Sequence, residues 1–390
     1  MRYIKSKDIF DKRVLMRVDF NLPVKNGNIL DDFRIRQILP TIQFLKKKKA
    51  KKIILISHFG QPDVKDRNKS EFSLEPIANH LEKLIGEKVY FITTLIGKEL
   101  KEEIENLPDN SIILLENIRF YRGENKNDKS FAKKLSDMAD IFINEAFSVC
   151  HRQTASLCAI TEFLPSYAGI LFEEELINLN RVIKKPSRPL VLILGGAKIK
   201  DKISVIEKFR NNTDCILLGG MMANTLLKVN DFCIGKSLYD KEALTQAEDL
   251  KIGKTELILP GDFVVLDKNN KKKVRELGKI TKDDKILDIG PIAGNTFSKI
   301  ISKAKTVLFN GPMGKFEDKR FINGTNKIIT AIIKNKKAFS VIGGGETVAS
   351  FKILNSKFKV PNSIFLSTSG GAMIKYLAGE SLPGLIALNY

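Results

Sequence analysis

The sequence predicts an α/β protein of two Rossmann-like domains with parallel sheets, joined by a connecting helix and a hinge. Short apolar runs rich in Ile, Val and Leu recur along the chain, and a segment long enough for a helix follows each of them. Continuous apolar runs of this kind are typical of parallel strands buried on both faces of a sheet. The length of 390 residues also exceeds the roughly 250 to 300 residues at which a single hydrophobic core stops growing.

The predicted strands fall into two sets. In the first half of the chain they are residues 13–18, 52–57, 111–116 and 141–144. In the second half they are residues 189–196, 215–220, 285–291, 306–312, 339–345 and 363–371. Sheets of this class bind ligands just beyond the carboxyl ends of their strands. The residues that follow each run are therefore the candidates for function.

One helix is predicted between the two sets of strands. Leu171, Leu176, Leu179 and Val182 recur at helical spacing, and Pro186 ends the pattern. This segment reads as a helix that connects two domains.

The domain boundaries follow from this helix. We expect residues 1–168, together with a C-terminal segment of about 378–390, to form the first domain. Residues 169–187 would form the connecting helix, and residues 188–377 the second domain.

The composition is that of a globular protein, with 43% apolar and 28% charged residues. No apolar run reaches the roughly 18 residues that a membrane span needs, and the first residues lack the apolar core of a secretory signal. The four cysteines form no CxxC pair, and three histidines are few for a zinc site. We expect a cytoplasmic protein.

The formal net charge of +20 admits two interpretations. A nucleic-acid-binding protein usually gathers its cations in one stripe or carries a recognisable motif such as a zinc finger or an RNP aromatic pair. Here the lysines are scattered, as at residues 46–49, 271–273 and 334–337, and no such motif accompanies them. We therefore favour a lysine-rich solvated surface without a nucleic-acid partner, whose field would still attract small anions.

The strand ends of the first half carry polar and cationic side chains, namely Asp19, Asn21, His58, Arg119 and, further along, Arg152. Such side chains can hold a small anionic, hydroxylated ligand. Each also has an ordinary explanation, because Asp and Asn are frequent in turns and most arginines lie on solvated surfaces. Taken together at one predicted sheet edge, they favour a site for an acidic metabolite.

The strand ends of the second half carry glycines, with Lys198 and Lys202 on one face of the following helix. Glycine lets backbone N–H groups approach a phosphate, although ordinary turns use glycine too. No P-loop is present, because Asn230 stands where that motif requires a glycine before Gly235. We therefore predict a nucleotide site made of separate glycine turns. One of them, residues 343–347, adds an acid and a hydroxyl that suit magnesium phosphate.

Short segments along the whole chain resemble phosphoglycerate kinases in order and spacing. The segments are RVDFNLP (17–23), DFRI (32–35), SHFG (57–60), LLENIRF (114–120), FSVCHR (147–152), ILGGAKIKDKI (193–203), FNGPMGKFE (309–317), GGGET (343–347), STSGGA (367–372) and LPGL (382–385). The resemblance implies reversible transfer of a phosphoryl group between 1,3-bisphosphoglycerate and magnesium ADP, which gives 3-phosphoglycerate and ATP. An acyl-phosphate kinase of another small phosphorylated acid is the alternative.

The resemblance also implies which residues bind the acid in the first domain. They are Asp19, Phe20, Asn21, Arg34, His58, Phe59, Gly60, Gln61, Arg119 and Arg152. Asp19, Asn21 and Arg34 would hold the hydroxyl and carboxylate of the glycerate. His58, Arg119 and Arg152 would hold the 3-phosphate, which does not react.

The nucleotide would bind to the second domain. The implied residues are Lys202, Gly220, Gly290, Glu317, Gly344, Gly345, Glu346 and Thr347. Lys202 would contact the phosphates, Glu317 the ribose, and Glu346 a magnesium ion, directly or through water. The groups that face the migrating phosphoryl would be Arg34, Lys198 and the backbone N–H groups of Gly370 and Gly371.

A carboxylate that is already ionised at pH 7 needs no general base, so the implied mechanism is in-line transfer with neutralisation of charge on the transferred group. Two ligands on separate domains must be brought together, so we expect hinge closure with the helix at 169–186 near the hinge. The resemblance further implies that residues 387–390 return to the first domain, and we expect a monomer.

The sequence departs from the family pattern at a few positions. Gln61 stands where the pattern has arginine, and the lost cation would lower substrate affinity by about ten- to a hundredfold unless Lys65 or Arg67 compensates. Glu346 replaces an aspartate, so its carboxylate reaches one carbon further. The remaining replacements are Phe309 for tryptophan and Met221 and Ser369 for glycine.

Overall fold

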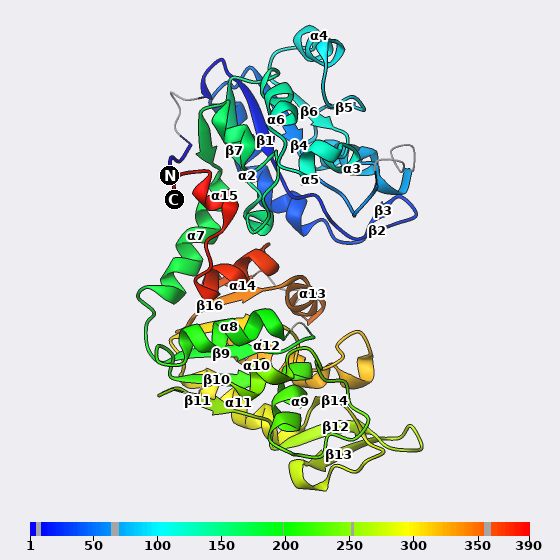
Figure 1. The fold of residues 1–390 in the computed structure, drawn as a ribbon, viewed down its shortest axis with the longest axis vertical. Coiled ribbons are helices and arrows are strands. Elements are labelled where there is room, and N and C mark those ends of the chain that lie inside the picture. The colour runs from blue at the N-terminus through cyan, green and yellow to red at the C-terminus, as the bar shows by residue number, and fades with distance from the viewer. Residues whose placement is uncertain (5–8, 64–69, 198, 251–252, 355–359) are drawn as a thin grey trace. The chain divides into compact units, whose positions relative to one another are not determined.

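The computed structural model describes residues 1–390 except 5–8, 64–69, 198, 251–252 and 355–359 (Figure 1). Lys198, Lys65 and Arg67 therefore lie outside the described residues. The chain divides into two units. The first consists of Met1–Ile177 with Ser381–Tyr390, and the second of Asn178–Glu380. Each unit contains a parallel sheet with helices, which confirms the predicted fold class.

Within the described residues, the first unit is built on a six-stranded sheet in the order β5-β6-β4-β1-β7-β8. The strands are β1 (Arg13–Arg17), β4 (Lys52–Ile56), β5 (Val89–Ile92), β6 (Ser111–Leu115), β7 (Ile141–Asn144) and β8 (Ser166–Ala168). All neighbouring strands are parallel. Arg17 pairs with Ile56 on one side and Asn144 on the other, so the carboxyl ends of three strands lie level. The predicted strands are confirmed, whereas β5 and β8 were not predicted.

Helices and short turns complete this unit. They are α2 (Phe33–Lys47), α3 (Glu75–Ile85), α4 (Lys98–Asn106), α5 (Arg122–Asn125), α6 (Lys129–Ser136) and α15 (Pro383–Ile386), with the 3-10 turns η2 (Ser70–Phe72), η3 (Ile118–Phe120), η4 (Phe147–Val149) and η5 (Ala159–Glu162) and the hairpin β2 (Val24–Lys25) and β3 (Asn28–Ile29). The C-terminal segment is tied to this unit, because the Gly384 amide donates to the Cys150 carbonyl oxygen at 2.9 Å.

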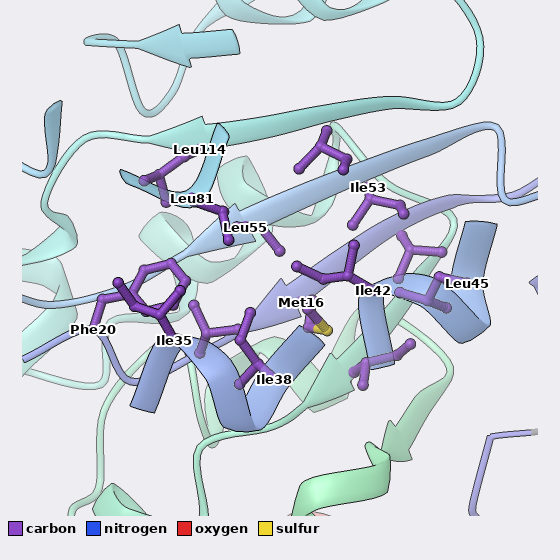
Figure 2. Close-up of a cluster of buried hydrophobic side chains, with 14 of the residues drawn as sticks. Met16, Phe20, Ile35, Ile38, Ile42, Leu45, Ile53, Leu55, Leu81 and Leu114 are labelled. Atoms are coloured by element: carbon purple, nitrogen blue, oxygen red, sulfur yellow. The ribbon is translucent and has the colours of Figure 1, made fainter. Parts of the chain in front are cut away.

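The apolar pattern of α2 explains how it covers the sheet. Ile35, Ile38, Ile42 and Leu45 lie on one helical face and are fully buried. They belong to the same core cluster as Met16 and the alternate residues of the neighbouring strands (Figure 2). The intervening strand residues form a second cluster on the other face of the sheet. Burial of each such side chain contributes about 1.5 to 3 kcal/mol.

In the second unit the main sheet has the order β11-β10-β9-β15-β16-β17, again with all neighbours parallel. The strands are β9 (Leu190–Leu194), β10 (Cys215–Leu218), β11 (Glu256–Ile258), β15 (Thr306–Asn310), β16 (Phe339–Gly343) and β17 (Ile364–Leu366). The helices are α8 (Lys200–Phe209), α9 (Gly220–Val229), α10 (Leu244–Glu248), α11 (Pro291–Lys303), α12 (Asn323–Lys334), α13 (Gly345–Leu354) and α14 (Gly371–Ala378), with turns η6 (Leu277–Lys279) and η7 (Lys319–Phe321).

The prediction of a parallel strand at residues 285–291 was wrong. This segment forms β14 (Lys285–Ile289), which pairs antiparallel with β12 (Asp262–Leu266) in a separate sheet that also contains β13 (Lys272–Glu276). The physical reason is that β14 is not buried on both faces: Lys285 is exposed and Leu287 is half-buried. A short apolar run does not distinguish a parallel from an antiparallel neighbour.

The predicted connecting helix is α7 (Ile170–Ile183). The four apolar residues that predicted it, Leu171, Leu176, Leu179 and Val182, are all buried. Among the described residues, no helix is both long and apolar enough to cross a membrane.

A buried carboxyl group from another strand end caps the start of α7. Glu145 follows β7 and is 1% exposed. Its Oε1 accepts from the Leu171 amide at 3.0 Å and from the Thr41 hydroxyl, and its Oε2 accepts from the Phe172 amide at 3.2 Å. Two of the amide groups that a helix start leaves without a helical partner are thereby satisfied. Burial raises the pKa of Glu145 to about 7, although these hydrogen bonds act to lower it.

The raised pKa predicts a stability change with pH. Glu145 holds its proton more tightly in the folded than in the unfolded chain, so its contribution is complete below the ordinary pKa of 4.5 and is lost as the pH rises through about 7. Between these pH values the free energy of unfolding of the first unit should fall by up to about 3 kcal/mol on this account.

Chemical denaturation of Glu145→Gln and the parent chain between pH 4.5 and 8 checks this. The fall should be much smaller in the variant, whereas Glu105→Gln, at an exposed helix position, should leave it unchanged. Parallel curves for Glu145→Gln and the parent would contradict the prediction.

Candidate functional site

The carboxyl edge of the first sheet gathers the polar side chains that the sequence singled out. Asp19 follows β1, His58 follows β4, Arg119 lies in η3 after β6, and Arg152 follows η4 after β7. Asp19, His58 and Arg119 are buried, and Arg152 is half-buried. Burial of charged groups is costly unless they are paired, so their partners indicate what the edge is built to do.

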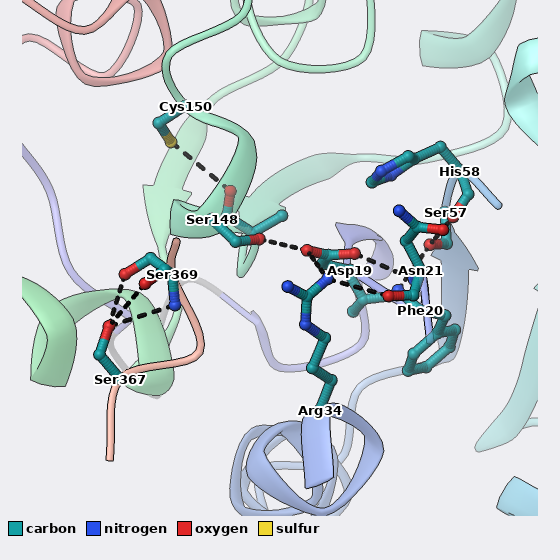
Figure 3. A network of polar contacts seen from close by, with 12 residues as sticks. Asp19, Phe20, Asn21, Arg34, Ser57, His58, Ser148, Cys150, Ser367 and Ser369 are labelled. Atoms are coloured by element: carbon teal, nitrogen blue, oxygen red, sulfur yellow. Dashed lines mark hydrogen bonds and ion pairs between the residues drawn. The ribbon is translucent and has the colours of Figure 1, made fainter. Parts of the chain in front are cut away.

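Asp19 is held from three directions (Figure 3). Its Oδ2 accepts from Arg34 Nη1 at 2.6 Å and from the Ser148 hydroxyl, and its Oδ1 accepts from the Asn21 amide at 3.0 Å. Burial alone would raise the pKa of Asp19, but the Arg34 guanidinium and these hydrogen bonds bring it well below its ordinary value. Asp19 is therefore an ionised carboxylate that fixes Arg34, whose side chain stays 27% exposed.

Cations outnumber anions around His58. Burial, followed by the nearby Arg152 and Arg17, lowers the pKa of Arg119 to about 10. Burial and the same three arginines also hold the pKa of His58 well below its ordinary value, against the opposing effect of Asp19. Groups that depress one another's pKa in this way gain from a bound anion, because an anion relieves the repulsion.

The loop after β4 is fixed by a buried amide. Asn117 Oδ1 accepts from the Phe59 and Arg119 amides, each at 3.1 Å. Its Nδ2 donates to the Phe59 carbonyl oxygen at 2.7 Å. Gly60 donates its amide to Asn21 Oδ1 at 3.0 Å, and its carbonyl oxygen accepts from the Arg119 guanidinium. One asparagine thus ties together the loops that carry the predicted residues.

Three predicted residues, Phe20, Phe59 and Gln61, do not place their side chains among the cations of this edge. The Phe20 and Phe59 side chains belong to the hydrophobic core cluster, so only their backbone groups can face the edge. Gln61 is exposed.

Several residues of this edge were not found from the sequence. They are Arg17, Asn117, Glu124, Ser148 and Ser156. Arg17 offered a signal, because it is a charged residue within an apolar strand and is only 2% exposed. Asn117 and Ser148 lie within the segments LLENIRF and FSVCHR that carry the family resemblance. Glu124 and Ser156 carried no signal, since they pair with each other across 32 residues.

The second unit contains a cavity of about 310 Å³ beside β14 and the turn after β15. Much of its wall is apolar, with Leu238, Phe263, Ile286, Ile289 and Met313 among the lining residues. Pockets of this size and lining suit a flat aromatic ligand group.

Some of the predicted nucleotide residues line this cavity and others do not. Gly220, Glu317 and Glu346 line it, and so does Met221. Gly290 does not: it caps α11, and the Asp262 carboxyl fills the space where a side chain at this position would lie.

The glycine turns of the second unit pack against each other. The Gly196 amide donates to the Pro312 carbonyl oxygen at 2.8 Å, and the Gly220 amide donates to the Met313 carbonyl oxygen at 2.9 Å. Gly220 has a φ of +57°, and a Cβ there would lie 2.7 Å from the Gly196 nitrogen. The close approach of the turns therefore requires these glycines, independently of any ligand.

Lys202 and Thr347 lie beneath these turns. Lys202 is 6% exposed, and its Nζ donates to the Gly195 carbonyl oxygen. Thr347 Oγ1 accepts from the Gly311 amide at 2.7 Å. Gly344 adopts a φ of +94°, and Gly345 begins α13.

The last turn of interest precedes α14. Gly370 caps this helix and Gly371 is its first residue. Ser369 is buried, and its hydroxyl lies 2.6 Å from the Ser367 hydroxyl, which also accepts from the Ser369 amide at 3.1 Å (Figure 3). The serine that replaces glycine here therefore takes part in a local hydrogen-bonded turn.

Comparison with known proteins identifies the family of the chain. A family model described as phosphoglycerate kinase matches residues 4–380. The phosphoglycerate kinase of Dictyoglomus turgidum is 41% identical over 393 aligned positions, which cover 99% of this chain and 98% of that protein. That of Pseudothermotoga lettingae is 42% identical and covers 98% of this chain and 97% of its own length.

Solved structures give the same result. Phosphoglycerate kinase from Coxiella burnetii superposes with a TM-score of 0.81 at 35% identity, over 98% of this chain and 97% of that one. The enzyme from Pyrococcus horikoshii OT3 superposes with a TM-score of 0.87 at 31% identity, over 100% of this chain and 98% of that one. The chain belongs to the phosphoglycerate kinase family.

Proposed function

We propose that the first unit binds the phosphorylated acid and the second unit the nucleotide. The activity itself is that of the family: reversible transfer of a phosphoryl group between 1,3-bisphosphoglycerate and ADP, which gives 3-phosphoglycerate and ATP in glycolysis. The observation that carries the division of labour is the contrast between the two strand edges. One presents an excess of buried cations, and the other presents an apolar cavity bordered by glycine turns.

His58, Arg119 and Arg152 would bind the 3-phosphate. Burial and mutual repulsion together lower the pKa of Arg119 and of His58. The role is supported by the repulsive part, which a phosphate dianion would relieve. Hydrogen bonds between charged groups contribute about 1.5 to 3 kcal/mol each.

Asp19, Asn21 and Arg34 would hold the glycerate. An ionised Asp19 can accept from the substrate hydroxyl, while Arg34, fixed by Asp19 at 2.6 Å, would donate to the carboxylate. Phe20, Phe59, Gly60 and Gln61 would frame the site. The two phenylalanines would do so through backbone groups, because their rings are in the core.

In the second unit the base would occupy the apolar cavity, with Glu317 at the ribose and Gly220 at its border. The phosphates would lie toward Lys202 and the turn of Gly344, Gly345 and Thr347. Gly290 would contribute through the start of α11.

Magnesium would arrive with the nucleotide. Glu346 is exposed and lines the cavity, so a hard oxygen ligand is available where the phosphates would lie. Within the described ranges, no group of three or more His, Cys, Asp or Glu side chains could hold a metal. One protein carboxylate combined with phosphate oxygens and water fits magnesium, which keeps several waters. The ion would neutralise phosphate charge when bound.

The transfer would be direct and in line, because an ionised carboxylate attacks without a general base. Arg34, Lys198 and the amides of Gly370 and Gly371 would neutralise charge on the migrating group, although Lys198 lies outside the described residues. Closure about a hinge near α7 would bring the ligands together and exclude water. We further propose that the chain acts as a cytoplasmic monomer without a nucleic-acid partner.

Two charge-removing variants test the division of labour. Arg119→Gln should raise the KM for 3-phosphoglycerate about tenfold or more and leave the KM for magnesium ATP nearly unchanged, because only the acid site loses a cation. Glu317→Gln should raise the KM for magnesium ATP and leave the KM for 3-phosphoglycerate nearly unchanged. Coupled steady-state assays with each substrate varied in turn give both constants. A common shift in both KM values for either variant would argue against separate sites.

Restoring the missing cation at Gln61 should tighten acid binding. Gln61→Arg is expected to lower the KM for 3-phosphoglycerate by about tenfold, the lower end of the range for a charged hydrogen bond, because the position is exposed. Gln43→Arg, at an exposed position of α2, adds the same charge away from the edge and serves as the control. An unchanged KM in Gln61→Arg would mean that another cation already fills the role.

Removing the charge of Glu346 should weaken magnesium dependence. For Glu346→Gln we expect the magnesium concentration at half-maximal rate to rise by roughly tenfold, as for other changes near a metal. Glu346→Asp keeps the carboxylate and should stay close to the parent. Magnesium titrations at fixed ATP measure this, and identical curves for all three proteins would refute a metal role.

A further inference from the structure

A buried chain of hydrogen bonds in the first unit runs from Glu124 through Ser156 and Arg17 to His58. Ser156 donates its hydroxyl to Glu124 Oε1 at 2.7 Å and its amide to Glu124 Oε2 at 2.9 Å. The same hydroxyl oxygen accepts from Arg17 Nε at 2.9 Å. Arg17 Nη2 lies 3.1 Å from His58 Nδ1. All four residues are at most 2% exposed.

The direction of this chain follows from the chemistry of its ends. A guanidinium has five N–H donors and no acceptor, and it stays protonated at neutral pH even where burial lowers its pKa, as it does for Arg17. A carboxylate only accepts. The Ser156 proton therefore points to Glu124, its lone pair faces Arg17, and Arg17 donates to His58.

We propose that Arg17, held by Ser156 and Glu124, is a positioning residue that fixes His58 as the neutral tautomer with its proton on Nε2. Nδ1 must accept from Arg17, so it cannot carry a proton. The remaining ring nitrogen is then a donor. His58 becomes an uncharged, directional N–H group for an anion at the sheet edge, on the side where Asp19 and Asn21 lie (Figure 3).

The surroundings of His58 support the neutral form. The charged groups that face it are Arg17 from β1, Arg119 from η3, Arg152 after η4 and Asp19 after β1. Burial and the three arginines disfavour the imidazolium, and Asp19 alone favours it, while being occupied by Arg34 at 2.6 Å. A protonated His58 would also place an N–H group against the Arg17 donor. Acid binding should therefore not acquire a histidine titration near its ordinary pKa of 6.5.

The role in acid binding rests on the proposed function, whereas the tautomer does not. The two can be tested separately. The chain has only three histidines, so full-length protein labelled with ¹⁵N-histidine gives few imidazole signals, and His58→Asn assigns those of His58. Without ligand, the parent should show a neutral ring protonated on Nε2 from pH 5.5 to 8.

Arg17→Met removes the donor. The His58 signals should then titrate with a pKa moved up toward 6.5 and show a population with the proton on Nδ1. Arg17→Lys keeps the charge but cannot bridge Ser156 and His58, so His58 should again lose its single tautomer. This variant provides the test if Arg17→Met does not fold. Arg13→Met, in the same strand and paired with Asp140 at 2.8 Å, is the matched control and should leave the His58 signals unchanged.

In assays with 3-phosphoglycerate, Arg17→Lys should raise the KM for the acid by about two- to tenfold at pH 8, the effect of one misdirected neutral hydrogen bond, and spare the KM for magnesium ATP. A parent His58 protonated on Nδ1 or charged at pH 6.5, or Arg17 variants with an unchanged tautomer, would overturn the inference. A changed tautomer with an unchanged KM for the acid would leave Arg17 as the group that sets the tautomer and would instead overturn the placing of the acid at His58.

Discussion

Excess positive charge buried at one sheet edge is the constraint on which the first unit depends. A buried guanidinium must find acceptors for its donors, and the fold supplies them from fixed groups. Arg17 donates to the Val18 carbonyl oxygen and to Ser156, and Arg119 donates to the Gly60 carbonyl oxygen. These are mostly neutral acceptors, so the cations are positioned without being neutralised. The pKa of Arg119 is lowered first by burial and then by the unrelieved repulsion from Arg152 and Arg17.

In the second unit the constraint is the close packing of backbone at the strand-end turns. Its strand-end turns approach so closely that Gly220 could not carry a Cβ without meeting the Gly196 nitrogen at 2.7 Å. The glycines are thus needed for packing. The turns are tied to each other through the Pro312 and Met313 carbonyl oxygens, so backbone hydrogen bonds hold the border of the cavity beside them. Binding a flat group in a preformed apolar cavity avoids the entropy of ordering loops on binding.

Features coded by local pattern could be predicted from the sequence, and features coded by distant pairing could not. The apolar runs located β1, β4 and β9, and helical spacing located α7, because each signal lies within one segment. The apolar run at β14 located a strand but did not predict its antiparallel partner, because the sequence of a strand does not specify which strand it pairs with. Arg17 stands 139 residues from Ser156, and Asn117 stands 58 residues from Phe59. Only the fold brings such pairs together, so the supporting residues of this edge were missed. The sequence did place Asp19, His58 and Arg119 at one sheet edge, where the structure has them.

The exposure of a residue also limits how much the departure at Gln61 can matter. Gln61 is exposed, and a charge at such a position is screened by water and salt. Arg17, Arg119 and His58 are buried, where the same charge or donor acts through a lower effective dielectric. A lost cation in the exposed loop therefore removes a modest part of the field at the edge, whereas a change at Arg17 would release Ser156, Glu124 and the orientation of His58 together. The exposed substitution leaves that chain intact, since its hydrogen bonds join Arg17, Ser156, Glu124 and His58.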